Sequence, residues 1–196
     1  MGREPRLIAA SKLLAYLLRH DPHAIGLALS PEGWADIDDL CCRALMVTRS
    51  IATSCSTSSR GNPKRRFEVD GERRRVRAQQ GHSVAVDLGL APREPPPILY
   101  HGTVERFLPA ILRDGLSRRS RRHVHLSAEQ DTALAVGARR GTPVVLSIDA
   151  GRMHAGGHTF FLSGNGVWLT EHVPPEFVSV PSPPRPPVTE RRKRRA

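Results

Sequence analysis

The chain has 196 residues, which fits one ordinary domain or two small ones and excludes a large multidomain machine. Hydrophobic residues make up 39% and charged residues 25%, a composition typical of globular proteins, and no apolar run is long enough to span a bilayer. Thirty Lys and Arg against 19 Asp and Glu give a net charge of +11, which favours a polyanionic partner such as nucleic acid, a nucleotide or an anionic membrane.

The hydrophobic pattern of the first half alternates between helical spacing and short strand-like runs. Helix, small strands and helix in this order favour a compact winged-helix-like lobe over residues 1–90. The predicted elements, in chain order, are a helix over 8–20, strands over 27–29 and 34–37, a helix over 38–46, a loop over 48–63 and a hairpin of strands 67–69 and 76–78.

A proline-rich stretch at 91–97 marks a change in composition, because proline stiffens the backbone and removes hydrogen-bond donors. We therefore place the domain boundary there and predict a small α+β lobe over residues 98–180. Its predicted elements are a strand over 98–100, a helix over 104–114 that Gly115 closes, a strand over 124–126, a helix over 128–139 and strands over 143–148, 159–162 and 167–169.

The last segment, 181–196, is rich in proline and arginine, which predicts a solvated, disordered tail. Without its six basic residues and one acidic residue, the rest of the chain keeps a net charge of +6.

Three cysteines, two of them adjacent and none in a CxxC pattern, predict neither a disulfide framework nor a zinc site. No targeting segment is evident, so we expect a soluble, cytoplasmic protein, and nothing demands more than a monomer.

Three basic groups stand beside the ends of predicted elements. Arg19-His20 ends the first helix, Lys64-Arg65-Arg66 precedes a strand, and Arg139-Arg140 ends another helix. Cations at a helix C-terminus stabilise the macrodipole and cap carbonyl groups, and a basic run is often only a solvated face. Each group alone is therefore a weak functional signal.

The segment His101-Gly102-Thr103 is predicted to close a strand before a helix, where backbone N–H groups and a hydroxyl cradle a phosphate. An ordinary turn with Thr103 as N-cap fits the same residues. Further along, His123 and His125 point to one face of a predicted strand, but two histidines without a third ligand do not predict a metal site. The sequence also lacks a phosphate-binding glycine loop and a nucleophile elbow.

Taken together, these segments resemble a known family, the RNA (tRNA) 2′-phosphotransferases, over residues 10–180. Eight ordered blocks at family-like spacing make a chance match implausible. The blocks are Ser11–His20, Gly33-Trp34, Lys64–Phe67, Arg77–Ser83, Leu99–Thr103, His123–Ser127, Gly137–Gly141 and Asn165–Leu169.

The resemblance implies an N-terminal winged-helix-like lobe that binds tRNA-like RNA and a C-terminal lobe with the ADP-ribosyltransferase fold that binds NAD+. It also implies a two-step reaction without a metal, in which NAD+ is consumed. An internal RNA 2′-phosphate attacks C1″ of the nicotinamide ribose and expels nicotinamide, giving a 2′-phospho-ADP-ribosylated RNA. Ribose O2″ then attacks phosphorus, which releases RNA with a 2′-hydroxyl and ADP-ribose 1″,2″-cyclic phosphate.

The resemblance also carries the family's site residues over to positions of this chain. Three arginine forks suit the clamping of a phosphomonoester that is already an anionic nucleophile, and a histidine suits proton transfer or phosphate orientation. Many protein-modifying ADP-ribosyltransferases have a catalytic Glu where this chain has Val167. A Glu there would repel an acceptor that is already negatively charged. The implied residues are Arg19, His20, Arg66 and Arg139 for catalysis, His101, Gly102, Thr103, His125, Leu126, Ser127 and Val167 for NAD+, and Lys64, Arg65 and Arg77 for RNA.

Two departures from the family pattern stand out. Residues 50–59 are rich in Ser and Thr where the family has a cleaner amphipathic helix, and the basic tail lies outside the family core. Two other functions stay open on the sequence alone. An ADP-ribosyltransferase that caps terminal nucleic-acid phosphates needs only the first step, and a catalytically inert RNA-binding module needs only the basic charge.

Overall fold

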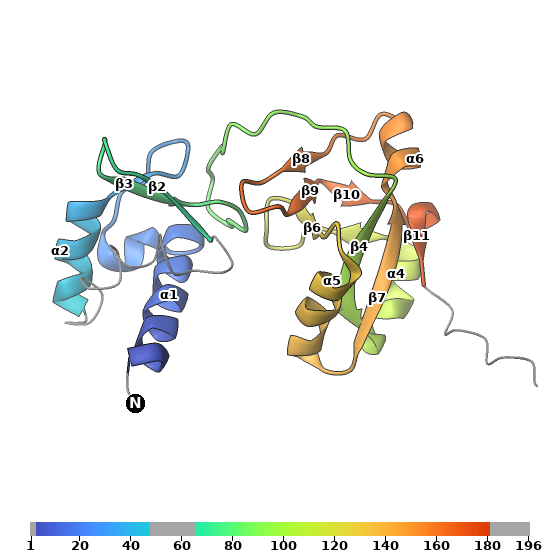
Figure 1. Ribbon diagram of the computed structural model, residues 1–196, viewed down its shortest axis with the longest axis horizontal. Helices are drawn as coiled ribbons and strands as arrows, with labels where there is room; N and C mark the ends of the chain where they lie inside the picture. Colours follow the sequence, from blue (N-terminus) through green and yellow to red (C-terminus); the bar gives the residue numbers. More distant parts are fainter. Residues whose placement is uncertain (1–2, 48–65, 181–196) are drawn as a thin grey trace, which may run out of the picture.

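The computed structural model describes residues 3–47 and 66–180, so the predicted loop at 48–63, Lys64, Arg65 and the predicted tail lie outside the described residues. In Figure 1 the elements before β4 lie together on one side of the molecule and those from β4 onward on the other. The first group consists of α1 (Arg3–Arg19), η1 (Pro22–Ile25), β1 (Ala35–Asp36), α2 (Ile37–Val47), β2 (Phe67–Asp70) and β3 (Arg75–Ala78).

This first group is built on an antiparallel sheet of strand order β1-β3-β2. Strands β2 and β3 pair in register from Phe67 opposite Ala78 to Asp70 opposite Arg75, which confirms the predicted hairpin. Leucines at helical spacing on α1 join the strands in one buried cluster, because their side chains share one face of the helix. The fully or nearly fully buried members are Leu14, Leu18, Leu27, Ala35, Leu40, Val76 and Ala78.

The second group forms three small antiparallel sheets, of strand order β11-β7-β4, β6-β9-β8 and β10-β5, so the α+β class is confirmed. Helix α5 lies against β4 and β7 (Figure 1). The elements are β4 (Ile98–Val104), η2 (Glu105–Phe107), α4 (Leu108–Asp114), β5 (Leu116–Ser117), β6 (Val124–Leu126), α5 (Gln130–Gly137), η3 (Ala138–Arg140), β7 (Pro143–Asp149), α6 (Ala150–Ala155), β8 (Phe161–Leu162), β9 (Trp168–Thr170), β10 (His172–Val173), η4 (Pro175–Phe177) and β11 (Val178–Ser179).

A separate hydrophobic cluster holds the second group together. Leu99 of β4 and Leu146 and Ile148 of β7 are fully buried in it, next to Phe160 at the start of the β8 region. Two further contacts tie the sheets to each other and to the preceding chain. Tyr100 of β4 pairs with Ser127 after β6, and Pro92 pairs with Phe161.

Two of the predicted local structures are wrong. Residues 27–29 do not form a strand, because the Leu27 N–H donates to the Pro22 carbonyl at 2.9 Å and closes η1 instead of joining a ladder. His101-Gly102-Thr103 does not close a strand either. These residues lie within β4, opposite 144–146 of β7, and Val104 rather than Thr103 is the N-cap residue of η2.

Gly102 allows α5 to pack directly on β4, and Gly102→Ala is expected to destabilise the protein. A Cβ atom there would lie 1.8 Å from the carbonyl oxygen of Ala133 and 2.9 Å from the amide nitrogen of Gly137, both backbone atoms of α5. Helix α5 must therefore shift, and overpacking of this kind costs about 1–3 kcal/mol. Urea unfolding measures the loss, with the exposed Gly71→Ala, where nothing lies within 4 Å, as the control. Equal stability of the two variants would contradict the prediction.

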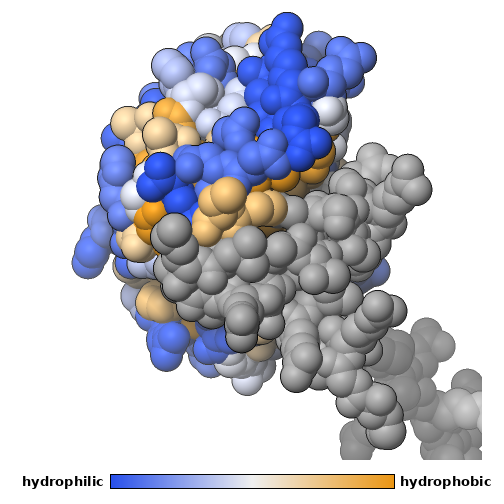
Figure 2. Space-filling view, turned by 90° about the vertical axis from the view of Figure 1, so that its left-hand side faces the viewer, coloured by the Kyte–Doolittle hydropathy of each residue, from blue (hydrophilic) through white to orange (hydrophobic). Residues whose placement is uncertain are grey.

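The surface of the first group is mostly hydrophilic, and its apolar side chains gather in a band beside the grey residues (Figure 2). Within the described residues, no helix is both long and apolar enough to cross a membrane.

Candidate active site

The segment after β3 caps the C-terminal end of α1. The backbone N–H groups of Ser83 and Val84 donate to the carbonyl of Arg19 at 2.9 and 3.3 Å, and the Ser83 hydroxyl donates to the same oxygen at 3.4 Å. The Ser83 hydroxyl also lies 2.9 Å from Nδ1 of His20. Because this segment satisfies the helix end, the Arg19 side chain is not needed as a cap, and His20 is oriented through one of its ring nitrogens.

The Arg19 guanidinium is largely buried, and no carboxylate of residues 3–47 or 66–180 forms an ion pair with it. Its Nε and Nη2 atoms have no hydrogen-bond partner among the residues that the structure describes. Burial, followed by the charges of Arg66 and Arg121, lowers the pKa of Arg19 to about 10. None of the ion pairs found within 3–47 and 66–180 involves these three arginines. A cluster of cations that repel one another and have donors to spare is a site for an anion.

Arg66 comes to this cluster from the start of the hairpin. It immediately precedes β2, its Nη1 donates to the Ser11 hydroxyl of α1 at 3.3 Å, and its carbonyl accepts the Gln79 N–H at 3.0 Å. Contacts at both ends of the residue therefore fix Arg66 between α1 and the end of β3. The sequence prediction placed Arg19 and Arg66 in one site, and the structure brings their charges together.

Arg121 is the residue that the sequence analysis missed. It lies in the segment between β5 and β6, and its Nη1 is 3.3 Å from Nδ1 of His125. Burial lowers the pKa of Arg121, and the charge of Arg140 lowers it further. Arg121 in turn lowers the pKa of both Arg19 and His20. The second group of elements thus contributes an arginine to the end of α1. The only sequence signal for Arg121 was its position two residues before His123, which the sequence analysis did single out.

Two more of the predicted residues lie at other places in the fold. Arg139 is exposed in η3, as Arg121 and His20 are in their segments, and the charge of its neighbour Arg140 acts on His101 and Arg121. Arg77 is engaged within the protein: its Nε donates to Glu68 at 2.8 Å and its guanidinium lies 4.5 Å from the centre of the Trp34 ring.

The predicted nucleotide-binding residues gather where β4 meets β6. His101 Nδ1 lies 3.0 Å from the carbonyl oxygen of His125, and the backbones of Tyr100 and Ser127 exchange hydrogen bonds of 2.8 and 2.9 Å. Two of the predicted residues contribute mainly backbone, since Thr103 is 6% exposed and Leu126 is 1% exposed. Val167 stands in the turn before β9, where its N–H donates to the buried Ser163 hydroxyl.

The histidines around the arginine cluster are held in the neutral form. Burial lowers the pKa of His82 to about 4 and that of His125 to about 3, with further lowering by nearby arginines. The same causes lower the pKa of His20 and His101. At neutral pH the positive charge of this region therefore comes from the arginines, and the imidazoles act as neutral donors and acceptors. Across the described residues, no group of three or more His, Cys, Asp or Glu is arranged to hold a metal ion.

Neutral burial of His82 makes stability depend on pH. The unfolded chain binds a proton near pH 6.5, whereas the folded chain does so only near pH 4. This contribution to stability is therefore fully present above pH 6.5 and is lost as the pH falls towards 4, with a loss of about 2 kcal/mol between pH 7 and pH 5. Urea unfolding at pH 7 and pH 5 measures the loss in the free energy of unfolding. This loss should be about 2 kcal/mol smaller in His82→Gln than in the native protein, whereas the exposed His154→Gln control should lose as much as the native protein. Equal losses in all three proteins would contradict the prediction.

Comparison with known proteins identifies the family. Residues 5–172 match the model of a family described as RNA 2′-phosphotransferase, Tpt1/KptA family. A probable RNA 2′-phosphotransferase of Agrobacterium fabrum is 51% identical over 173 residues, which cover 88% of this chain and 93% of that protein. The chain belongs to the RNA 2′-phosphotransferase family.

Other members of the RNA 2′-phosphotransferase family are equally similar. The probable enzyme of Burkholderia lata is 51% identical over 180 residues, covering 89% of this chain and 91% of that protein. The one of Streptomyces coelicolor is 48% identical over 185 residues, covering 92% and 99%. The chain is therefore an enzyme, a transferase of this family, and the resemblance found in the sequence is confirmed. The family match includes Arg19, Arg66 and Arg121 and leaves out the tail after residue 180.

Proposed function

We propose that this protein is an NAD+-dependent RNA 2′-phosphotransferase, which removes an internal 2′-phosphate from RNA. The observation that carries the proposal is the cluster of Arg19, Arg66 and Arg121. Arg19 has buried donors without a partner, and none of the three arginines forms an ion pair with a carboxylate of the described residues. A dianionic phosphomonoester satisfies such a cluster, because guanidinium forks bind phosphate oxygens bidentately.

The two groups of elements take the two substrates. An N-terminal winged-helix-like lobe over 1–90 binds the RNA, and Lys64, Arg65 and Arg77 hold flanking phosphates. A C-terminal ADP-ribosyltransferase-like lobe over 98–180 binds NAD+, and the tail takes no part. The two separate buried clusters support this division.

The strands β4 and β6 supply the surface for NAD+, which is a substrate and not a resident cofactor. NAD+ contacts the side chains of the partly exposed residues of these strands. At Thr103 and Leu126, whose side chains are buried, it contacts the backbone. His101 Nδ1 lies 3.0 Å from the carbonyl oxygen of His125, which fixes the two strands against each other at this surface. The proposed residues are His101, Gly102, Thr103, His125, Leu126, Ser127 and Val167.

In the first step a phosphate oxygen forms a bond to C1″ of the nicotinamide ribose while the bond from C1″ to the nicotinamide nitrogen breaks. The electron pair of that bond leaves with nicotinamide. The phosphate needs no base, so the contribution of this chain is to hold it in line with C1″ through Arg19, Arg66 and Arg139, with Arg121 as a fourth cation. Val167 adds no negative charge where one would repel the phosphate.

In the second step ribose O2″ attacks phosphorus and the bond from phosphorus to RNA O2′ breaks. The proton of the O2″ hydroxyl must leave and a proton must reach O2′. His20 is the residue for both transfers, because its lowered pKa keeps it neutral and Ser83 fixes its Nδ1 atom. The products are RNA with a 2′-hydroxyl and ADP-ribose 1″,2″-cyclic phosphate.

The test is to incubate the protein with NAD+ and a short RNA that carries one internal 2′-phosphate, and to analyse the RNA and nucleotide products by mass spectrometry. The same RNA with a 2′-hydroxyl is the control. Loss of the phosphate together with formation of the cyclic phosphate is the expected result. Unchanged RNA without nicotinamide release would indicate a binding module, and ADP-ribosylation of a terminal phosphate alone would indicate a capping transferase.

A further inference from the structure

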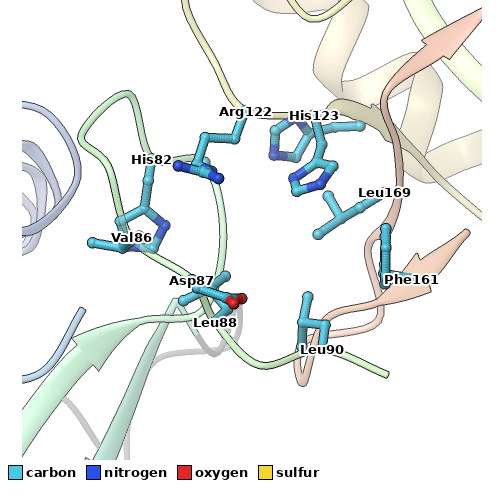
Figure 3. A pocket seen from close by; sticks show the side chains of 11 residues that line it. His82, Val86, Asp87, Leu88, Leu90, Arg122, His123, Phe161 and Leu169 are labelled. Carbon is cyan, nitrogen blue, oxygen red and sulfur yellow. The ribbon is translucent and has the colours of Figure 1, made fainter. Parts of the chain in front are cut away.

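A cavity of about 210 Å³ lies between residues 81–90 and the sheet β6-β9-β8, and the proposed reaction does not account for it. Figure 3 shows His82, Val86, Asp87, Leu88 and Leu90 on the side of the cavity that this segment forms, with His123, Phe161 and Leu169 on the sheet side and Arg122 between them. Five of its eleven lining residues are apolar, and the others are a glycine, three histidines, Asp87 and Arg122, a mixture that suits a ring with polar edges. The apolar wall residues are Val86, Leu88, Leu90, Phe161 and Leu169.

Two buried imidazole nitrogens give the cavity a polar character. His82 is only 2% exposed, and its backbone carbonyl accepts the Arg122 N–H at 3.2 Å. Nε2 of His82 and Nε2 of His125 are both buried, and neither has a hydrogen-bond partner among the residues described. Because Arg121 can only donate to Nδ1 of His125, the proton of that neutral ring is on Nε2, which is therefore a donor. Buried polar atoms of this kind are usually paired, so a ligand with polar edges is expected.

The cavity lies next to Arg19 of the arginine cluster. Gly81 lines it and packs on Arg19, since a Cβ atom at Gly81 would be 3.7 Å from Cδ and Nη1 of that arginine. A nucleophile that displaces nicotinamide in line approaches C1″ from the face opposite the leaving ring. The ring next to the phosphate clamp therefore belongs to the RNA and not to NAD+.

We propose that this cavity binds the base of the RNA nucleotide that carries the 2′-phosphate, stacked against Phe161 and His123, with Nε2 of His82 and of His125 on its polar edge. The two stacking rings already contact each other edge to face, with centroids 5.6 Å apart. Single-stranded RNA is commonly bound in this way, by aromatic stacking of a splayed-out base and hydrogen bonds to its edge. The proposal rests on the proposed function of the arginine cluster.

The first experiment needs no variant. Two RNAs are compared with the native protein at saturating NAD+, one with an ordinary 2′-phosphorylated nucleotide and one whose 2′-phosphorylated nucleotide has no base. We expect kcat/KM to fall by about 5-fold to 150-fold for the abasic RNA, the range that base–aromatic stacking supplies. Equal kcat/KM for the two RNAs would overturn the proposal. If neither RNA loses its phosphate, the proposed function fails instead.

The second experiment removes the stacking ring. Phe161→Ala should lower kcat/KM for the ordinary RNA but not for the abasic one, since the abasic RNA has no base to lose. Phe177→Ala is the matched control, because Phe177 makes the same kind of edge contact with His158, at 5.7 Å, away from the cavity. An equal loss on both RNAs together with a raised KM for NAD+ would mean that the cavity takes the nicotinamide ring, and the proposal would be wrong.

Discussion

Arg121→Ala is expected to lower kcat for phosphate removal by about a hundredfold to a thousandfold, the loss typical when one preorganised donor to a developing charge is removed. The charge of Arg121 lowers the pKa of Arg19 and of His20, across the two groups of elements. Arg121→Lys should restore only part of the rate, because an ammonium group keeps the charge but not the planar fork.

Arg139→Ala is the matched comparison, because the sequence resemblance assigns the third clamp arginine to that position. Arg139 and Arg121 are both exposed, so exposure does not separate them, and we expect Arg139→Ala also to lower kcat by about a hundredfold to a thousandfold. Both variants are assayed for loss of the RNA 2′-phosphate with saturating NAD+. A native rate in Arg139→Ala would remove Arg139 from the clamp, and a native rate in Arg121→Ala would remove Arg121 from it.

His20→Ala is expected to slow the second step by about a hundredfold to ten thousandfold, the usual contribution of a general acid or base. The first step needs no proton transfer, so nicotinamide should still be released and ADP-ribosylated RNA should accumulate. Rapid quenching followed by mass spectrometry of the RNA measures that intermediate directly.

Ser83→Ala tests how His20 is oriented. The substitution removes the hydroxyl 2.9 Å from Nδ1 of His20 but leaves the backbone caps on the α1 terminus in place. A smaller accumulation of the same intermediate is expected. If His20→Ala instead blocked nicotinamide release, the histidine would act in the first step and the assignment would be wrong.

The local structure was predictable wherever a short pattern decides it. The hairpin of β2 and β3, the strand β6 and the end of α4 at Gly115 follow from alternation, turn residues and a glycine with φ of +77°. Strands of two residues, such as β5, β10 and β11, are too short to have a period and were not predicted. Helix α6 was missed as well, since only six residues form it.

The site was predictable in part, and the reason is distance along the chain. Arg19 and His20 are adjacent, and sequence blocks identify them together with Arg66. Arg121 reaches the same place only because the segment before β6 folds back towards the end of α1, a contact between residues about a hundred positions apart. The error at His101–Thr103 has a local cause, because β4 runs directly into η2 without the turn that the glycine suggests.

Three guanidinium groups, none of which pairs with a carboxylate in the described part of the chain, also determine which phosphates the protein prefers. An RNA strand carries one charge on every diester, whereas a 2′-monoester carries close to two at pH 7. Relief of the repulsion among Arg19, Arg66 and Arg121 grows with the charge of the bound group, so the monoester is favoured over the many diesters that surround it. Selectivity for one modified nucleotide in a long polymer then needs no reading of sequence, and it weakens below about pH 6, where the monoester dianion takes up a proton and becomes a monoanion.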